Sequence, residues 1–549
     1  MLMNKIKTRF SIRAMLYGLL ACSMMSCSDN LDIQIVEVKG QPYDPSKPIE
    51  VTDYSPKSGA AGQQMVVYGK NFGTDPSIIK VTVGGAEAVV ISACGDAIYC
   101  LTPSKSETDE EPTFNPVEDE EEDAPVAQDT PEEGDEEEEE ESSANSRSVW
   151  VAVGPQGAMQ SAQAEAVFTY EPTWHVRTVV GTVNDKKEAE IKDGPFGDCG
   201  NIMNAATFAA DPLNPLHIYV SSDLYTGGNT AGVGARSDVR LIDFEKKEVS
   251  TIFNVSHFGK NRLRDVKFTR DEEANMLIAI DDGTPSVILV KRKKNGDELL
   301  TGKEAFAGQP GLGLVYNTSQ CNGVDVHPVT GTMFFNRYGD GSFHKFPDTD
   351  LNPDMTSIYD CLDYPADHNY HKAQKMFAHG ETGLEMRVEI HPQGNYMLIL
   401  QINGGSYIAK SMYNATYDTY GMMSAFIGRH STAGGGSGYI DDVGTEAKTN
   451  SPRQIAWVKN PEYAGNTDEY DAYFTDRSNH CIRKITPTGV VSTFAGRGSG
   501  TGNPRGYADG LARGEALFDC PCGLYYNEER NVFWVGDTWN LRIREIYYE

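Results

Sequence analysis

The sequence predicts an all-β protein with at least two folded units, and three observations support this prediction. The chain has 549 residues, which is more than one ordinary domain holds. Its 54 glycines and 27 prolines favour turns and short strands. Near the C-terminus, from Gly438 to Ile546, one pattern of about 70 residues occurs twice. Because such a unit cannot bury its own faces alone, the larger unit is predicted to be an array of stacked repeats.

The repeated pattern combines turn signals with strand signals. The first copy reads Gly-Tyr-Ile-Asp-Asp from Gly438, Tyr-Phe-Thr-Asp from Tyr473 and Ile-Arg-Lys-Ile from Ile482. The second copy reads Gly-Tyr-Ala-Asp-Gly from Gly506, Trp-Val-Gly-Asp from Trp534 and Ile-Arg-Glu-Ile from Ile543. A turn followed by an inner strand and further strands is typical of one blade of a β-propeller.

The apolar inner-strand pattern can be placed six times after residue 172. Its positions are 206–208, 266–268, 324–326, 388–390, 455–457 and 524–526. Their spacing averages about 64 residues, which suits four-stranded blades with long loops. We therefore predict a six-bladed β-propeller over residues 173–549. Residues 176–180 are predicted to complete the sheet of the last blade and so remove its open edge.

Residues 48–172 are predicted to form a smaller immunoglobulin-like sandwich. Pro56 and Gly59 break the first strand, and a β-rich run resumes at Met65 and ends near Asn71. Further strands are expected at 80–83, 88–91, 98–101, 149–153 and 166–170. A set of short strands of this size is typical of a two-sheet sandwich.

An acidic segment, residues 106–146, interrupts this smaller unit. Between Glu107 and Glu141 it holds 20 Asp or Glu and no Lys or Arg. Such a run cannot collapse, so we expect a disordered loop; it lacks the alternating ligands and glycine of a calcium loop. Without these 20 residues the net charge of −31 becomes −11. Nucleic acid is not an expected partner, because phosphate backbones require basic patches.

The N-terminus has the pattern of a targeting segment. Four basic residues up to Arg13 precede an apolar stretch, Ala14 to Ser26, that is too short to span a bilayer. Cys22 and Cys27 each follow a small residue, as in a bacterial lipoprotein signal. We predict a signal peptide over residues 1–27 with Cys27 lipidated, Cys22 being the alternative. Residues 28–47 are predicted to be a flexible tether.

Export places the eight remaining cysteines in an oxidising compartment. Cys94 and Cys100 are close enough in the sequence to bridge two adjacent strands. Cys520 and Cys522 flank a proline, but no second Cys/His pair with metal-ligand spacing accompanies them. We interpret them as small residues packed at the start of an inner strand, and we expect neither a metal nor a cofactor.

Two stretches resemble known families. Ser-Pro-x-x-Gly at 55–59, followed by Gly-x-Asn-Phe at 69–72, resembles the opening of an IPT/TIG domain, which is an immunoglobulin-like sandwich. The last two repeats resemble NHL repeats in their Gly-x-x-Asp-Gly start, Asp-x-x-Asn turn and Ile-Arg-Lys-Ile strand. The first four blades keep only the apolar skeleton. The resemblance implies an NHL-type propeller.

The mouth of the propeller channel is the place to look for a site. The residues directly before the inner strands include Arg264, Asp265, Arg387 and Arg453. A calcium-dependent propeller hydrolase needs several inward acidic and amide ligands, and here only Asp265 and two asparagines are available. The sequence also lacks a Gly-x-Ser-x-Gly elbow, a His-Glu-x-x-His motif and a phosphate loop. We therefore predict no catalytic residues, although propellers include both binders and enzymes.

Aromatic residues in the blade turns are candidates for stacking on sugar rings. Trp539 lies in the turn between the second and third strands of blade six, where blade five has Ser478. Tyr338 occupies the related turn of blade three. Tyr439 and Tyr507 belong to the repeat signature and are expected to pack between blades. Trp539, Tyr338 and the residues at the channel mouth form the predicted ligand-binding set.

A lipid anchor, a tether, an Ig-like spacer and a propeller together resemble the accessory surface lipoproteins of Bacteroidetes glycan-uptake systems. That resemblance implies an outer-membrane protein that faces the cell exterior, binds a glycan without cleaving it and accompanies a SusC/SusD-like transporter. One alternative is a propeller hydrolase or lyase acting on a lactone, phosphoester or sugar derivative. Another is a protein-interaction module of an outer-membrane complex.

Overall fold

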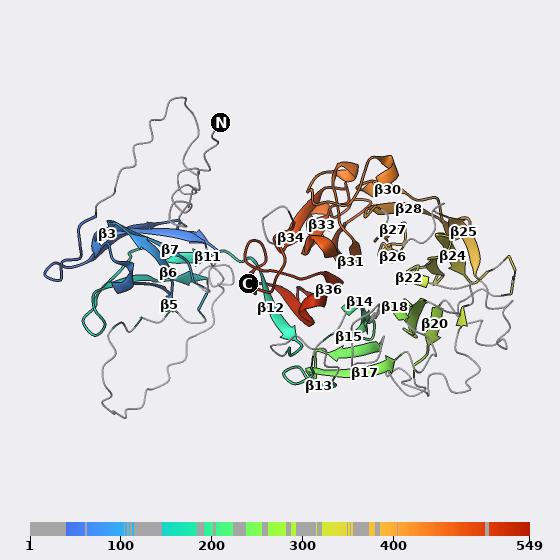
Figure 1. The fold of residues 1–549 in the computed structure, drawn as a ribbon, viewed down its shortest axis with the longest axis horizontal. Coiled ribbons are helices and arrows are strands. Elements are labelled where there is room, and N and C mark those ends of the chain that lie inside the picture. The colour runs from blue at the N-terminus through green and yellow to red at the C-terminus, as the bar shows by residue number, and fades with distance from the viewer. Residues whose placement is uncertain are drawn as a thin grey trace, which may run out of the picture. The chain divides into compact units, whose positions relative to one another are not determined.

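The chain divides into two units, Met1–Glu171 and Pro172–Glu549, and each is described here by itself. The structure is a computed structural model (Figure 1). It describes residues 40–60, 63–103, 105–106, 109, 112, 114, 145–183, 192–200, 202, 205–222, 238–254, 262–281, 287–292, 314–315, 321–348, 350–351, 353–354, 373–378, 385–402, 405–499 and 504–549. Within these ranges no helix is both long and apolar enough to cross a membrane.

The first unit is a β-sandwich. One sheet has the order β1 (Glu50–Ser55), β3 (Gln64–Gly73), β7 (Gly95–Leu101) and β6 (Val89–Ala93). The second has the order β10 (Gln160–Gln163), β9 (Val149–Val153), β4 (Ile79–Val83) and β5 (Ala86–Glu87). A small third sheet has the order β2 (Ser58–Gly59), β11 (Phe168–Tyr170) and β8 (Ser146–Arg147). Alternating residues such as Val67, Val81, Val151 and Phe168 are fully buried in one core, so the predicted strands form a sandwich.

Two expectations for this unit need correction. Residues 40–47, assigned to the tether, pack on the sandwich: Tyr43 contacts its core, and Asp44 and Asn71 exchange two hydrogen bonds of 2.9 and 2.8 Å. Cys94 and Cys100 do not form the proposed bridge, since both thiols are free. The signal peptide, Cys22, Cys27 and nearly all of the acidic insert lie outside the described residues.

The second unit is a ring of six sheets (Figure 1). Blade 1 contains β14 (Ala205–Asp211), β15 (Asn214–Ser222), β16 (Asp238–Asp243), β17 (Glu248–Asn254) and β13 (Gly194–Pro195). Blade 2 contains β18 (Arg262–Phe268), β19 (Met276–Asp281), β20 (Val287–Val290) and β21 (Leu314–Val315). Blade 3 contains β22 (Cys321–Val326), β23 (Met333–Arg337), β24 (Ser342–Phe346) and β25 (Gln374–Ala378).

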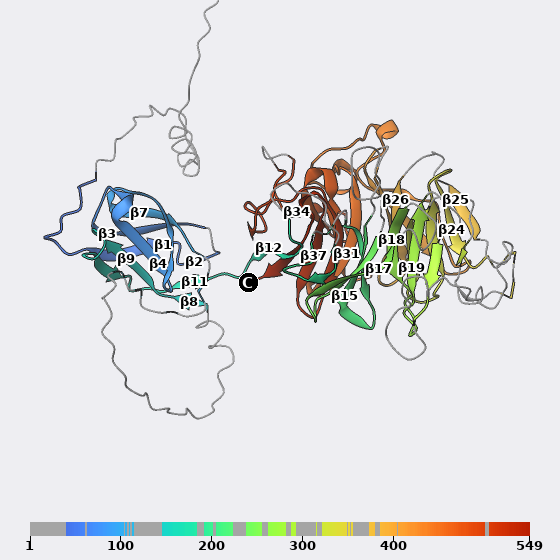
Figure 2. The ribbon, with the colours of Figure 1, turned by 60° about the horizontal axis from the view of Figure 1, so that its bottom comes forward.

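The remaining blades complete the ring. Blade 4 contains β26 (Met386–Ile390), β27 (Tyr396–Gln401), β28 (Ile408–Asn414), β29 (Thr419–Tyr420) and β30 (Ser424–Ile427). Blade 5 contains β31 (Pro452–Lys459), β32 (Tyr470–Asp476), β33 (Cys481–Ile485) and β34 (Val491–Ala495). Blade 6 contains β36 (Pro521–Asn527), β37 (Val532–Asp537), β38 (Arg542–Tyr548), β12 (Trp174–Val180) and β35 (Gly510–Leu511). Each blade begins with the inner strand that the apolar pattern predicts. Figure 2 shows the blade strands running alongside one another.

Blade 6 closes the ring with strands from both ends of the unit. β12 pairs antiparallel with β38, from Trp174 opposite Tyr548 to Val180 opposite Ile543. The inner strands also meet around the ring, with β36 against both β31 and β14. The predicted closure by residues 176–180 is therefore present, and β12 covers the edge that β38 would otherwise expose.

The repeat signature builds a buried ion network in blade 5. The Arg483 guanidinium is 2.8 Å from Asp441 and 2.9 Å from Asp476. Asn479 donates a 2.8 Å hydrogen bond to the same Asp476 carboxylate. Tyr439 stacks beside Arg483, with 5.3 Å between the ring centroid and the guanidinium carbon. Packing and charge pairing inside the blade thus explain the residues of the repeat signature.

Blade 6 repeats that network with equivalent residues. Arg544 binds the carboxylates of Asp509 and Asp537, and Asn540 donates to Asp537 at 2.8 Å. Tyr507 lies beside Arg544, with its ring centroid 5.0 Å from the guanidinium carbon. Tyr439 and Tyr507 each pack against the arginine of their own blade, but Tyr507 is 43% exposed and so is not buried between blades as the repeat pattern predicts.

Candidate functional site

The starts of the inner strands and the turns after the second strands lie at the same end of the blades. Pro452 pairs with Asp476 across β31 and β32, and Pro521 pairs with Asp537 across β36 and β37. The short 3-10 turns Arg477–Asn479 and Thr538–Asn540 follow directly. We call the polar and aromatic side chains at this end the mouth cluster. Its members are Arg264, Glu385, Arg453, Arg477, His480, Arg505, Asp519 and Trp539.

Trp539 is the exposed aromatic side chain of the mouth cluster. It is 45% exposed, and its backbone N–H donates to the Asp519 carbonyl at 3.0 Å, which fixes the turn. The guanidinium carbon of Arg505 lies 4.8 Å from the indole centroid, and that of Arg477 lies 5.4 Å away. An exposed indole with cations beside it offers an apolar surface bordered by hydrogen-bond donors.

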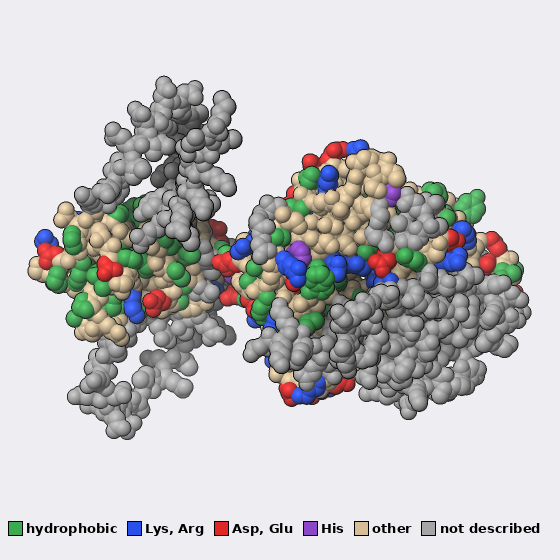
Figure 3. All heavy atoms as spheres, in the orientation of Figure 1, with side chains coloured by type: hydrophobic (Ala, Val, Ile, Leu, Met, Phe, Trp, Pro, Cys, Tyr) green, Lys and Arg blue, Asp and Glu red, His purple; other side chains and the backbone are tan. Residues whose placement is uncertain are grey.

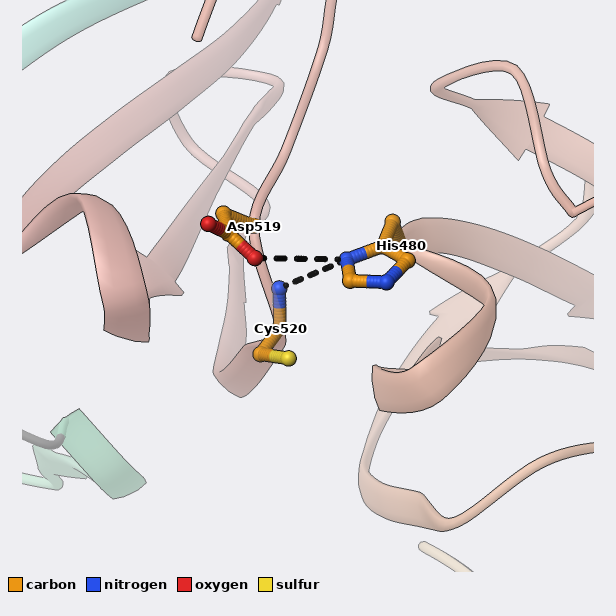
Figure 4. Close-up of side chains that lie close together, drawn as sticks. All are labelled: His480, Asp519 and Cys520. Carbon is orange, nitrogen blue, oxygen red and sulfur yellow. Dashed lines mark hydrogen bonds and ion pairs between the residues drawn. The ribbon is translucent and has the colours of Figure 1, made fainter. Parts of the chain in front are cut away.

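His480, Asp519 and Cys520 join blades 5 and 6 next to this indole (Figure 4). The backbone N–H of Cys520 donates to His480 Nδ1 at 3.1 Å, and Asp519 Oδ1 lies 3.5 Å from the same nitrogen. Arg505 Nε donates to Asp519 Oδ2 at 3.0 Å. Burial lowers the pKa of His480, the Asp519 carboxylate opposes that shift, and Arg505 and Arg477 reinforce it.

The same three residues bring nitrogen, oxygen and sulfur atoms within 4.8 Å of one another, a set that could hold a metal ion. An ion there would have to displace the Cys520 N–H from Nδ1 and to share Asp519 with Arg505. Burial also raises the pKa of the Cys520 thiol to about 12, so the thiol stays protonated near neutral pH. These contacts favour a structural link between blades over a metal site or a Cys–His nucleophile.

Glu385 links two of the three predicted arginines across the channel. It lies 2.7 Å from Arg264 and 3.8 Å from Arg453. Arg453, the more exposed of the two, has a side chain 17% exposed. Burial lowers the pKa of Arg453, and Glu385 opposes that shift. Arg264 and Arg453, two of the predicted ligand-binding residues, therefore lie close together around the Glu385 carboxylate.

Two predicted contact residues lie in the interior. Asp265 is fully buried and accepts hydrogen bonds from the backbone N–H groups of Val266 and Val324, at 3.0 and 3.2 Å. Arg387 is 2% exposed and donates to the Asn322 carbonyl. Both side chains tie neighbouring inner strands together, because Asp265 on β18 and Arg387 on β26 each bond a backbone group of β22. The structure thus assigns them a structural role.

Tyr338 lies half-buried in the turn between β23 and β24 of blade 3. Its neighbours Arg337 and Asp340 form a 3.1 Å ion pair. No contact joins Tyr338 to the mouth cluster in the part of the chain that the structure describes. Tyr338 is at the corresponding end of its blade, but the structure does not bring it together with Trp539.

The structure adds Arg477, His480, Arg505, Asp519 and Glu385 to the predicted residues. The first two occupy turn positions in blade 5 where blade 6 has Thr538 and Leu541, and Asp519 stands where blade 5 has Asn450. Aligning the two repeats and noting where they differ could have found these three. Arg505 and Glu385 occupy the positions that Ser437 and Pro452 hold in blade 5, so the same comparison of repeats could have found them too.

Around the middle of the propeller face in Figure 3, Lys and Arg side chains gather with a His, hydrophobic and acidic side chains. This surface can stack a ring on an indole and donate hydrogen bonds from several guanidinium groups. Both properties are those of a carbohydrate or small polar ligand site.

Comparison with known proteins places this architecture in a class. Residues 48–115 match the IPT/TIG domain family model. An auxiliary nutrient binding protein from Bacteroides thetaiotaomicron is 30% identical, with 92% of this chain and 99% of that chain covered and a TM-score of 0.68. A second protein from the same organism, proposed to be a phosphatase, is 31% identical, with coverage of 93% and 99% and a TM-score of 0.71. No protein among the curated ones matches the chain.

A further auxiliary nutrient binding protein, from Bacteroides ovatus, is 27% identical, with coverage of 93% and 100% and a TM-score of 0.56. The chain is therefore an IPT/TIG sandwich joined to a six-bladed propeller. Within that class it belongs to the family that includes the two Bacteroides thetaiotaomicron proteins.

Proposed function

We propose that this protein binds a glycan at the cell surface through the mouth cluster and so supports nutrient uptake. The single observation that carries the proposal is Trp539, an exposed indole bordered by two guanidinium groups in a turn where the sister blade has a serine. Two relatives described as auxiliary nutrient binding proteins support a binding role. The sandwich serves as a spacer in this proposal.

Titration calorimetry of the protein with a panel of oligosaccharides tests the proposal. Trp539→Ala is expected to weaken binding about tenfold or more, because it removes the stacking surface at the centre of the contact. Tyr417→Ala is the matched control, since Tyr417 is a 69% exposed aromatic residue on the outer part of blade 4. A panel without any binding, or equal affinity of both variants, would contradict the proposal.

A second candidate function is phosphoester hydrolysis, and the 31% identical relative proposed to be a phosphatase favours it. Arginines at the mouth would then hold the phosphoryl group. A screen of phosphomonoesters with the purified protein tests this candidate: turnover that Arg453→Gln abolishes supports it, and no turnover eliminates it. Co-purification from membranes would instead reveal a protein partner, such as the SusC/SusD-like transporter that the resemblance implies.

The proposed location is the outer membrane, with a lipid on Cys27 and the propeller facing outward. The basic and apolar N-terminal segment ending in a cysteine supports this anchor. Metabolic labelling with palmitate separates the two cysteines: Cys27→Ser is expected to abolish the label and Cys22→Ser to retain it. The reverse result would move the anchor to Cys22.

A further inference from the structure

The arginines of the mouth cluster are paired differently from the arginines inside the blades. Arg483 and Arg544 each contact two carboxylates, so their charge is fully compensated by the fold. Among the described residues no carboxylate lies within ion-pair distance of the Arg477 guanidinium, which instead lies beside the Trp539 ring. The five N–H donors of Arg477 are thus available to a ligand.

Other mouth arginines are only partly compensated. The two carboxylates of the cluster are already shared, because Glu385 lies between Arg264 and Arg453, and Asp519 pairs with Arg505. Arg453 Nε is buried and has no hydrogen-bond partner, and the Arg453 ion pair with Glu385 is long, at 3.8 Å. In the described part of the mouth, Arg453, Arg477 and Arg505 therefore face two carboxylates with an excess of positive charge.

Partly buried guanidinium groups in excess over carboxylates cost free energy unless a bound anion compensates their charge. Desolvation penalises the charged form, and the planar fork of arginine matches carboxylate and sulfate oxygens in pairs. The nearby indole suits the apolar face of a sugar ring. The whole chain carries a net charge of −31, so this local excess runs against its overall composition.

We infer that the ligand is an acidic glycan, whose uronate carboxylate or sulfate ester is held by Arg477 and Arg453 while a sugar ring stacks on Trp539. The inference rests on the proposed function and specifies its ligand class. The positive charge at the mouth also attracts such a polyanion to this end of the propeller, whereas the acidic remainder of the surface repels it. Binding then depends on salt, because exposed charge pairs are screened at high ionic strength.

Calorimetry with three probes tests the inference: oligogalacturonate, chondroitin sulfate and neutral dextran oligosaccharides. The first two distinguish a carboxylate from a sulfate as the recognised group, because oligogalacturonate carries carboxylates alone. Binding to at least one acidic probe is expected to exceed dextran binding about tenfold and to weaken when salt rises from 50 to 500 mM. Arg477→Gln is expected to lower acidic-probe affinity about fivefold to tenfold.

The matched control is Arg530→Gln, which removes the same charge from an exposed residue in the turn between β36 and β37, at the opposite end of blade 6. It should leave affinity unchanged, which separates a local contact from a change in net charge. Preferential dextran binding, or equal effects of the two variants, would overturn the acidic-ligand inference and leave glycan binding intact. Absence of binding to every probe, and to the wider panel, would overturn both.

Discussion

Blades 5 and 6 are built on one plan, yet they differ at the end that carries the candidate site. Both have an arginine between two carboxylates and an asparagine that closes the turn. At the mouth, blade 5 presents Arg477 and Ser478, whereas blade 6 presents Thr538 and Trp539. The repeated residues thus hold each blade together, whereas the residues that differ include the exposed Trp539 and the Arg477 beside it.

Physical chemistry explains why the two sets separate in this way. A buried charge must be paired wherever it occurs, so every copy of the blade must keep its carboxylates. A turn residue at the mouth has no such requirement, because water can hydrogen-bond to its polar groups in the absence of a ligand. Residues there can differ between blades without cost to the fold.

The largest effect is expected from breaking the buried network of blade 6. Asp537→Ala removes the fully buried one of the two carboxylates that pair with Arg544 and should lower the free energy of unfolding by about 3–5 kcal/mol. Asp537 Oδ1 also accepts the Asp519 N–H at 2.7 Å, so glycan binding should weaken as well. Urea denaturation and calorimetry measure the two effects.

Asp476→Ala is the comparison variant in blade 5. It should destabilise the protein by a similar amount, because Arg483 loses the same partner. The Asp476 carboxylate accepts a hydrogen bond from the Asn450 N–H, and because Asn450 lies outside the mouth cluster, the binding loss should be smaller. A loss below about 1 kcal/mol for either variant would contradict the structural role given to these networks.

A somewhat smaller effect is expected from protonation of an interior histidine. Burial lowers the pKa of His344 in blade 3 to about 4, against an ordinary value of 6.5. Because the unfolded chain takes up this proton first, stability should fall as pH decreases from about 6.5 to 4, by up to about 3 kcal/mol from this residue.

Denaturation at a series of pH values measures the His344 effect. His344→Gln should be less stable at pH 7, through loss of packing, and should show a shallower decline between pH 6.5 and 4. Identical pH profiles for the two proteins would show that His344 does not titrate in this way. Taking the difference between variants cancels the contributions of other groups.

The smallest effect is expected at the mouth histidine. Below its lowered pKa, His480 adds a positive charge beside Asp519, Arg505 and Arg477. Affinity for chondroitin sulfate, whose sulfate stays charged, should therefore rise about twofold to fivefold as the pH falls below 6.5 and His480 takes up a proton. His480→Asn, which suits the positive φ of 56° at this position, should remove that pH dependence. An unchanged profile would exclude His480 as its source.

The sequence determined the fold because the fold rests on local, repeated signals. Alternating apolar residues, glycine and proline turns and the doubled Asp-x-x-Asn signature predict the sandwich, the six inner strands and the closure by residues 176–180. The packing of residues 40–47 on the sandwich was not predicted, because Gly, Asp and Pro composition does not show that Tyr43 reaches the core.

At the candidate site, the sequence named Trp539, Arg264 and Arg453 as candidates, but only the tertiary structure decided which arginines lie together and which charges are compensated. Asp265 and Arg387 are residue types that often bind ligands at a surface. Here both are buried, and each forms a hydrogen bond with a backbone group of the neighbouring inner strand. Arg505 and Glu385 lie outside the named strands, and they reach the mouth because the ring brings distant segments together. Whether a charge is compensated depends on which residues lie beside it in space. Those neighbours are determined only when the ring closes.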